Sequence, residues 1–204
     1  DTHPGATLPS DSVADGFETT SAGQTVGGAW LPQAFRAAGA VDAATRRRRI
    51  QAAIDLLVKY HKPLVAAMDE DFGGRHPGFS LMNDVLGSLA SLKHARDHFE
   101  PWMAPEKRQP FMPYDQLGAE AWVQYQPKGS VGIIGTWNAP LFTLFAPLAY
   151  ALAAGNRAIL KPSEIAPLSG ILVAEIMDEA GVPPGVFNLV NGDGLGVGEA
   201  MSVH

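Results

Sequence analysis

The segment at 127–140 reads PKGSVGIIGTWNAP, and its apolar centre, SVGIIGT, is typical of a buried β-strand. Two further apolar runs follow it, NRAILK at 156–161 and VFNLV at 186–190. Segments with helical spacing alternate with these runs and lie at 141–154, 166–180 and 195–202. Continuous apolar strands separated by helices predict a parallel sheet that is covered on both faces. The second half is therefore predicted to be an α/β layer.

The upstream half shows the periodicity of helices. From residue 50 onward, apolar side chains recur at spacings of three and four, and the predicted helical region ends at the Gly73–Gly74 pair. A longer helix is predicted from Leu81 to Trp102, because apolar residues again step by three or four positions and Pro101 closes its regular part.

Between these halves, Pro105, Pro110 and Pro113 predict a connecting loop, and AEAWVQYQP at 119–127 alternates as an edge strand does. Residues 1–40 are rich in Gly, Ser, Thr, Asp and Ala and predict an extended arm with one short helical turn at 31–38. The predicted organisation is an arm at 1–40, a helical part at 41–113, a strand region at 114–127 and the α/β layer at 128–204.

The composition excludes several function classes. A net charge of −6 and a pI near 5.4 give no positive field for nucleic acid, and the basic run Arg46–Arg49 is expected to be a solvated helix face. No run approaches the about 20 apolar residues of a membrane span, and no signal peptide is evident, so no membrane partner and a cytoplasmic location are expected. The absence of cysteine excludes disulfides and thiol nucleophiles within this sequence.

The glycine-rich segment NGDGLGVGEA at 191–200 follows a predicted strand and opens a predicted helix, as a pyrophosphate-binding loop does. From Gly192 the pattern is G-x-G-x-G-x-G, and Val197 stands where the common dinucleotide fingerprint has its last glycine. The segment alone is therefore either a cofactor loop or an ordinary glycine turn.

Two other segments place polar side chains at strand ends. In LKPSE at 160–164, Lys161 offers a point charge and Glu164 a carboxylate for a ribose diol, unless they are merely a strand-end lysine and a first-turn glutamate. Asn138 is either a fixed amide donor for an oxyanion or a helix cap. His94, Asp97 and His98 share a helix face, but no further ligand is evident, so a polar surface is expected there and no metal site.

Taken together, PKGSVGIIGTWNAP, LAYALAAGNRAILKPSE and AGVPPGVFNLVNGDGLGVGEA resemble the aldehyde dehydrogenase superfamily in order and spacing, and residues 69–107 look like its coniferyl aldehyde dehydrogenase branch. The resemblance covers Val41 to His204. It implies an α/β fold with an N-terminal helical region and a modified Rossmann-type parallel sheet, incomplete here, because we expect the chain to be part of a longer protein.

The resemblance also assigns site residues. Asn138 matches the asparagine that donates to the oxyanion, and Lys161 and Glu164, with Ser163 beside them, match the residues that bind the adenine ribose of NAD, although NADP is possible. Thr136 departs from the proline that is common at its position, which leaves the loop less rigid. The remaining matches are Ile134, Gly135, Thr136 and Trp137 on the nicotinamide side, and Gly194 and Gly198 beneath the adenine and pyrophosphate.

The implied reaction is the oxidation of an aldehyde, aromatic if the branch is right, to its carboxylic acid. It needs a cysteine thiolate and a glutamate that the family carries beyond the end of this sequence, so the 204 residues alone are expected to be inactive. The strand at 119–127 matches part of an oligomerisation sheet and implies a homodimer or homotetramer. The alternative is a non-catalytic nucleotide-binding or scaffolding fragment.

Overall fold

The computed structural model describes residues 39, 41–179 and 185–203, and the predicted arm at 1–40, apart from Gly39, lies outside them together with its helical turn. The N-terminal elements are α2 (Ala43–Phe72), α3 (Pro77–Ser80), the π-helical η1 (Leu81–Leu86) and α4 (Gly87–Trp102). Two strands follow, β1 (Glu106–Arg108) and β2 (Ala121–Val123). The remaining elements are β3 (Ser130–Ile134), α5 (Phe142–Ala153), β4 (Arg157–Lys161), α6 (Pro167–Glu179), β5 (Phe187–Leu189), η2 (Gly194–Gly198) and α7 (Glu199–Val203).

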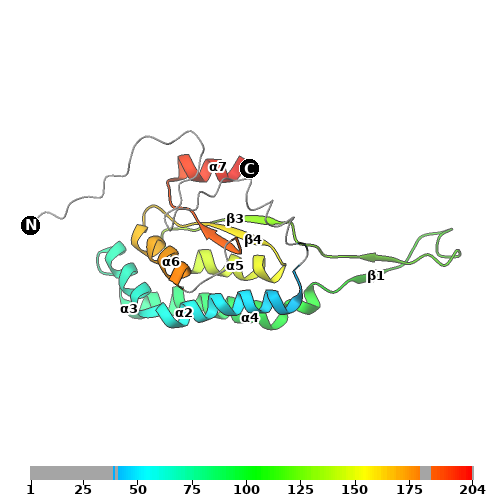
Figure 1. The fold of residues 1–204 in the computed structure, drawn as a ribbon, viewed down its shortest axis with the longest axis horizontal. Helices are drawn as coiled ribbons and strands as arrows, with labels where there is room; N and C mark the ends of the chain where they lie inside the picture. Colours follow the sequence, from blue (N-terminus) through cyan, green and yellow to red (C-terminus); the bar gives the residue numbers. More distant parts are fainter. Residues whose placement is uncertain (1–38, 40, 180–184, 204) are drawn as a thin grey trace, which may run out of the picture.

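The predicted parallel sheet is confirmed. Its strand order is β3-β4-β5, with Ile133 opposite Leu160 and Leu160 opposite Leu189. Helices α5 and α6 lie between the sheet and the outer helices α2 and α4, whereas α7 lies on the other side of the sheet (Figure 1). The prediction that both faces are covered holds for β4 and β5, whose residues are buried or half-buried, but not for β3, in which Gly132 and Ile134 are exposed.

Helix α2 begins and ends at local signals. The side chain of Asp42 accepts a hydrogen bond from the backbone N–H of Thr45 at 2.6 Å, as an N-cap does. Gly73 closes the helix in the left-handed region with φ of 63°, a conformation that glycine adopts without a Cβ penalty. The apolar positions predicted to face the core, including Ile50 and Leu57, are fully buried.

The loop predicted from prolines is wrong in one part, because it contains strand β1. Lys107 of β1 lies opposite Trp122 of β2 in an antiparallel pair. The charged sequence of β1 carries no strand pattern, and the strand exists through pairing with β2 and through a hydrogen bond from Tyr125 to Glu106. The resulting hairpin projects away from the helices and the sheet (Figure 1).

Two carboxylates from the N-terminal region cap the helices that cover the sheet. Asp71 accepts hydrogen bonds from the backbone N–H groups of Leu168 and Ser169 at 2.9 and 2.8 Å, at the start of α6. Asp84 accepts from Leu141 and Phe142 at 3.1 and 3.3 Å, at the start of α5. These carboxylates satisfy amides that have no partner inside their own helices.

Candidate functional site at the carboxyl edge of the sheet

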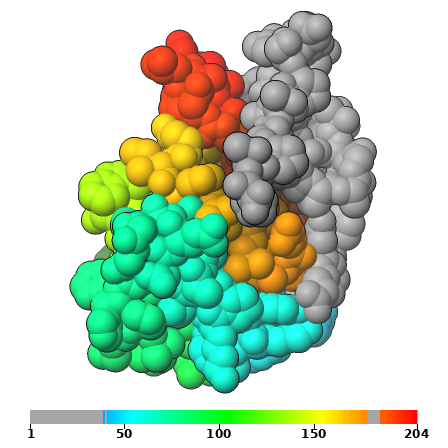
Figure 2. All heavy atoms as spheres, turned by 90° about the vertical axis from the view of Figure 1, so that its left-hand side faces the viewer, coloured from blue at the N-terminus to red at the C-terminus, as the bar shows by residue number. Residues whose placement is uncertain are grey.

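An open hollow of about 830 Å³ lies where β3 and β4 end. Figure 2 shows this face, on which the segment after β3 (chartreuse), the segment after β4 (gold) and the region of η2 and α7 (red) lie together. All ten residues that the resemblance assigns to the site line this hollow, namely Ile134, Gly135, Thr136, Trp137, Asn138, Lys161, Ser163, Glu164, Gly194 and Gly198. Ligands bind at this edge in open α/β sheets.

Tight packing fixes the start of the first lining segment. The N–H of Gly135 donates to the carbonyl oxygen of Lys161 at 2.8 Å, which extends the pairing of β3 and β4 by one bond. A Cβ at Gly135 would come within 2.8 Å of the buried side chain of Leu144. The backbone of residue 135 therefore lies against helix α5, and the chain leaves the sheet at this point.

Thr136 orients the amide of Asn138. The Thr136 hydroxyl donates to Oδ1 of Asn138 at 2.7 Å, so the Asn138 nitrogen is the end of the amide left to donate to a ligand. The backbone N–H of Thr136 also donates to Oγ1 of Thr143 at 2.9 Å. A proline has neither of these donors, so Thr136 replaces ring rigidity with two hydrogen bonds.

The helix-cap alternative for Asn138 does not hold. The N-cap position of α5 is Leu141, whose own side chain makes no capping hydrogen bond. The amides at the start of α5 instead bind Asp84, as described above. The Asn138 side chain is exposed at the hollow and is free of a capping role.

Lys161 and Glu164 form an ion pair on the lining. Nζ of Lys161 donates to Oε2 of Glu164 and to the carbonyl oxygen of Pro162, both at 3.0 Å. The Lys161 side chain is only 2% exposed, whereas that of Glu164 is 47% exposed. The backbone N–H of Glu164 and the Lys161 ammonium lower the pKa of the Glu164 carboxyl below its ordinary value, with a further contribution from Gly194. Glu164 is therefore an ionised acceptor at the surface of the hollow.

The glycine-rich segment forms the third part of the lining. Asp193 caps η2 by accepting a hydrogen bond from the N–H of Gly196 at 2.6 Å. The predicted helix begins as this π-helical turn and continues as α7. A Cβ at Gly192 would lie 2.3 Å from Cγ2 of Val197, whereas one at Gly194 would meet nothing closer than Glu164 Oε1 at 3.8 Å. The close packing of the turn therefore requires a glycine at residue 192, whereas Gly194 faces the hollow.

Sequence patterns did not identify Arg75 and Asp84, whose side chains bind the backbone of the segment that carries Asn138. Arg75 lines a second cavity of about 320 Å³ together with Phe79, Trp137 and Asn138. A sequence signal for Asp84 does exist, since Ser80, Asp84 and Ser88 recur at spacings of four on a helical face and are all fully buried. Buried polar residues at such spacing indicate partners from another part of the chain.

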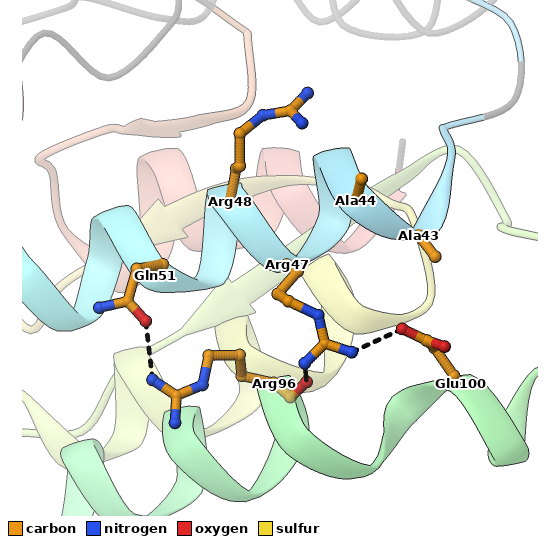
Figure 3. A pocket seen from close by; sticks show the side chains of 7 residues that line it. All are labelled: Ala43, Ala44, Arg47, Arg48, Gln51, Arg96 and Glu100. Carbon is orange, nitrogen blue, oxygen red and sulfur yellow. Dashed lines mark hydrogen bonds and ion pairs between the residues drawn. The ribbon is translucent and has the colours of Figure 1, made fainter.

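The prediction that the arginine run is a solvated face holds fully only for Arg48. The Arg47 side chain is 43% exposed, and Arg46 and Arg47 also bind other elements of the chain. Arg46 donates to carbonyl oxygens at Val41 and Ala153. Figure 3 shows a pocket of about 740 Å³ between α2 and α4 in which Arg47 points to Glu100 and to the Arg96 carbonyl, while Arg48 points away from α4. Arg47 donates to the Arg96 carbonyl oxygen at 2.7 Å and to the Glu100 carboxylate at 2.5 Å. Its hydrogen bonds in this pocket are therefore made within the chain.

The histidines of α4 are arranged as an aromatic stack. The rings of His94 and His98 lie 4.5 Å apart, and Asp97 is bound by Arg96 at 2.8 and 2.9 Å. Within the part of the chain that the structure describes, no group of three or more His, Cys, Asp or Glu side chains is placed to hold a metal ion. Among the described helices, none combines the length and the apolar composition that a membrane span requires.

Curated relatives match about two thirds of this chain. A probable coniferyl aldehyde dehydrogenase of Caulobacter vibrioides is 44% identical over 143 residues, which are 70% of this chain and 30% of the relative. The coniferyl aldehyde dehydrogenase of Pseudomonas sp. HR199 is 44% identical over 132 residues, 65% of this chain and 27% of that protein. The chain thus spans about 30% of the length of the curated relatives it matches.

Solved structures share the fold. PnpE from Pseudomonas sp. WBC-3 superposes with a TM-score of 0.73 at 32% identity, over 86% of this chain and 35% of PnpE. AldA of P. syringae, an indole-3-acetaldehyde dehydrogenase solved with NAD+, superposes with a TM-score of 0.73 at 30% identity, over 85% of this chain and 34% of AldA. Residues 24–204 match the profile described as the aldehyde dehydrogenase family. The chain therefore belongs to the aldehyde dehydrogenase family.

Proposed function

We propose that this chain forms the cofactor-binding part of an enzyme that oxidises an aldehyde to the carboxylic acid with NAD+. The observation that carries the proposal is the hollow at the carboxyl edge of the sheet, which is lined by every residue that the family resemblance assigns to the site. Its volume of about 830 Å³ falls within the about 300–1,000 Å³ typical of small-molecule sites.

The polar groups of the hollow fit a nucleotide ribose. The Lys161 ammonium has three N–H donors, and two of them are used within the described residues, by Pro162 and Glu164. The third can serve a ribose hydroxyl, while Glu164 accepts from the neighbouring hydroxyl. An ionised Glu164 repels a 2′-phosphate, so we propose that NAD is preferred to NADP.

Asn138 supplies the catalytic donor of the proposed site. When bound, NAD+ would supply the hydride acceptor for the oxidation, and residues 134–137 would hold its nicotinamide. The Asn138 amide nitrogen, oriented by Thr136, would donate to the oxyanion of the substrate. The sequence contains no cysteine, so the thiolate that the reaction requires must come from elsewhere in the enzyme.

We propose an aromatic aldehyde as substrate, because two relatives at 44% identity are named for coniferyl aldehyde. The test compares kcat/KM for coniferyl aldehyde and hexanal in the intact enzyme that contains this chain, alongside calorimetric titration of NAD. We expect the aromatic aldehyde to be preferred and Lys161→Ala to weaken NAD binding. A preference for hexanal would overturn the substrate, and NAD binding without aldehyde-dependent NADH formation would favour a non-catalytic nucleotide-binding role.

We further propose that the β1–β2 hairpin mediates association into a homodimer or homotetramer. The hairpin region projects from the molecule (Figure 1) and exposes Phe111, Leu117 and Trp122 by 76, 76 and 58%, and exposed apolar side chains of this size mark interaction surfaces. Light scattering on the intact protein should show a smaller species for Trp122→Ser. An unchanged mass for Trp122→Ser combined with Leu117→Ser would contradict this role of the hairpin.

A further inference from the structure

Arg75 connects the N-terminal helices to the segment that carries Asn138. Its side chain is 7% exposed, and its guanidinium lies 4.5 Å from the ring centre of Phe72 and 4.8 Å from that of Phe79. Nη1 donates to the backbone carbonyl oxygen of Asn138 at 2.9 Å, and Nη2 donates to Oδ2 of Asp84 at 2.6 Å. The guanidinium is thus held by two rings, one carboxylate and one carbonyl.

Asp84 completes the connection from the other side. Its side chain is fully buried, and Oδ1 accepts the N–H groups of Leu141 and Phe142. The ion pair therefore binds the backbone at residue 138 through Arg75 and at residues 141 and 142 through Asp84. Since only two residues separate Asn138 from Leu141, both ends of this short segment are fixed to the same buried pair.

We propose that Arg75 and Asp84 are positioning residues that hold the Asn138 amide where it can stabilise the oxyanion. The proposal rests on the function proposed above. Removal of one partner leaves the other charge buried and unpaired, so the pair resists rearrangement. Oxyanion stabilisation requires a donor that is fixed in advance, and a shift of about 1 Å at the backbone is enough to lose it.

Arg47 provides a control with the same kinds of contact, at a site where its side chain is 43% exposed, compared with 7% for Arg75. Like Arg75, it donates to a backbone carbonyl, that of Arg96 at 2.7 Å, and to a carboxylate, that of Glu100 at 2.5 Å, and its guanidinium lies 5.5 Å from the ring centre of Phe99. It ties α2 to α4 outside the hollow (Figure 3). Arg47→Gln therefore removes the same kinds of contact without touching the segment of Asn138.

The kinetic test uses the intact enzyme that contains this chain. For Arg75→Gln we expect kcat to fall by about 100-fold, the loss typical of removing one oxyanion donor, with the KM for NAD unchanged. Arg75→Lys keeps the charge beside Asp84 and should recover part of kcat, while Arg47→Gln should leave kcat within about 2-fold, as surface changes do. An unchanged kcat in Arg75→Gln, or an equal loss in Arg47→Gln, would overturn the proposal.

A double-mutant cycle between Arg75 and Asn138 distinguishes a positioning role of Arg75 from a general loss of structure in the variant. If Arg75 acts through Asn138, Arg75→Gln should lower kcat by less than about 3-fold in an Asn138→Ala background, since residues that act as a unit are not additive. A repeated 100-fold loss in that background would show that Arg75 acts by another route and would refute the positioning role.

Hydrogen exchange tests the positioning without any reaction. In Arg75→Gln and Asp84→Asn, the amides of Leu141 and Phe142 should exchange faster than in the parent enzyme, whereas Arg47→Gln should leave them unchanged. Unaltered exchange in Arg75→Gln would refute the positioning role whatever the kinetics. Faster exchange in an enzyme that oxidises no aldehyde would instead refute the proposed function and leave the contact between the pair and the segment established.

Discussion

The hydroxyl of Thr136 donates to Oδ1 of Asn138 across 2.7 Å, and this bond determines which end of the Asn138 amide is available to a ligand. Thr136→Val removes the bond while keeping the branched shape. Because a neutral hydrogen bond contributes about 1 kcal/mol net, we expect kcat of the proposed dehydrogenase to fall by about 3- to 10-fold. Steady-state kinetics of the intact enzyme measure the change.

Thr136→Ser serves as the control, since it retains the hydroxyl and should keep kcat near that of the parent. Thr136→Pro loses both the hydroxyl and the N–H bound to Thr143, so it should lower kcat at least as much as Thr136→Val. If Thr136→Val and Thr136→Ser behave alike, the hydroxyl does not orient Asn138.

Glu164 should contribute to NAD affinity over a wide pH range. The pKa of its carboxyl lies below the ordinary 4.5 because its own backbone N–H and the Lys161 ammonium stabilise the charged form. A contribution from a group with a lowered pKa is complete above its ordinary value and is lost as the pH falls through the lowered pKa. The dissociation constant of NAD for Glu164→Gln relative to the parent should therefore be raised by about 10-fold, as for loss of a charged hydrogen bond, at every pH from 5 to 8.

Calorimetric titrations at pH 5, 6, 7 and 8 with both proteins give this ratio. A ratio that disappears between pH 8 and 6 would mean that another group carries the effect. The same variant should also bind NADP with less of a penalty, since the charge that repels the 2′-phosphate is gone.

Loss of the Asp71 cap should lower stability. In Asp71→Ala the first turn of α6 loses bonds to two backbone N–H groups and to the hydroxyl of Ser169 at 2.6 Å. The expected decrease in the free energy of unfolding is about 1–3 kcal/mol, and urea denaturation at a fixed protein concentration measures it. Asp69→Ala, which changes an exposed side chain on the same helix, should have a much smaller effect, and equal effects would contradict the cap.

Substitutions at Gly192 and Gly194 should differ in their effects on thermal stability and on NAD affinity. Gly192→Ala places a methyl group 2.3 Å from Cγ2 of Val197, so the turn must shift, and we expect both thermal stability and NAD affinity to decrease. Gly194→Ala adds a methyl group with no contact closer than 3.8 Å, so only NAD affinity should decrease. Thermal melting with and without NAD distinguishes the two outcomes. Equal losses of stability would show that Gly194 also serves the turn.

The sequence was most informative where the signal is local. The three parallel strands and their helices could be predicted because each is a continuous apolar or periodic run. Strand β1 could not, since its residues are charged and its structure depends on pairing with β2. Family resemblance led to the ten residues that line one hollow, and their roles remain predictions.

Contacts between distant residues were out of reach of sequence patterns. Asp84 binds Leu141 across 57 residues of sequence, and Asp71 binds Ser169 across 98. Arg46 and Arg47 belong to a run of arginines whose composition indicated only solvation, yet both bind carbonyl oxygens. Tertiary contacts of this kind are set by packing, which spacing alone does not reveal.

Because Asp84 caps α5 and Asp71 caps α6, the residues around the hollow cannot be transferred to another protein without part of the N-terminal helical region. A graft that moves only residues 128–203 into another scaffold would leave two helices without the acceptors for their first amides, although every lining residue of the hollow would be present. A graft that begins at Asp42 carries both carboxylates with it. The smallest segment that could be transferred with this cofactor site must therefore include the carboxylates that cap α5 and α6. It extends well beyond the residues that would touch the cofactor.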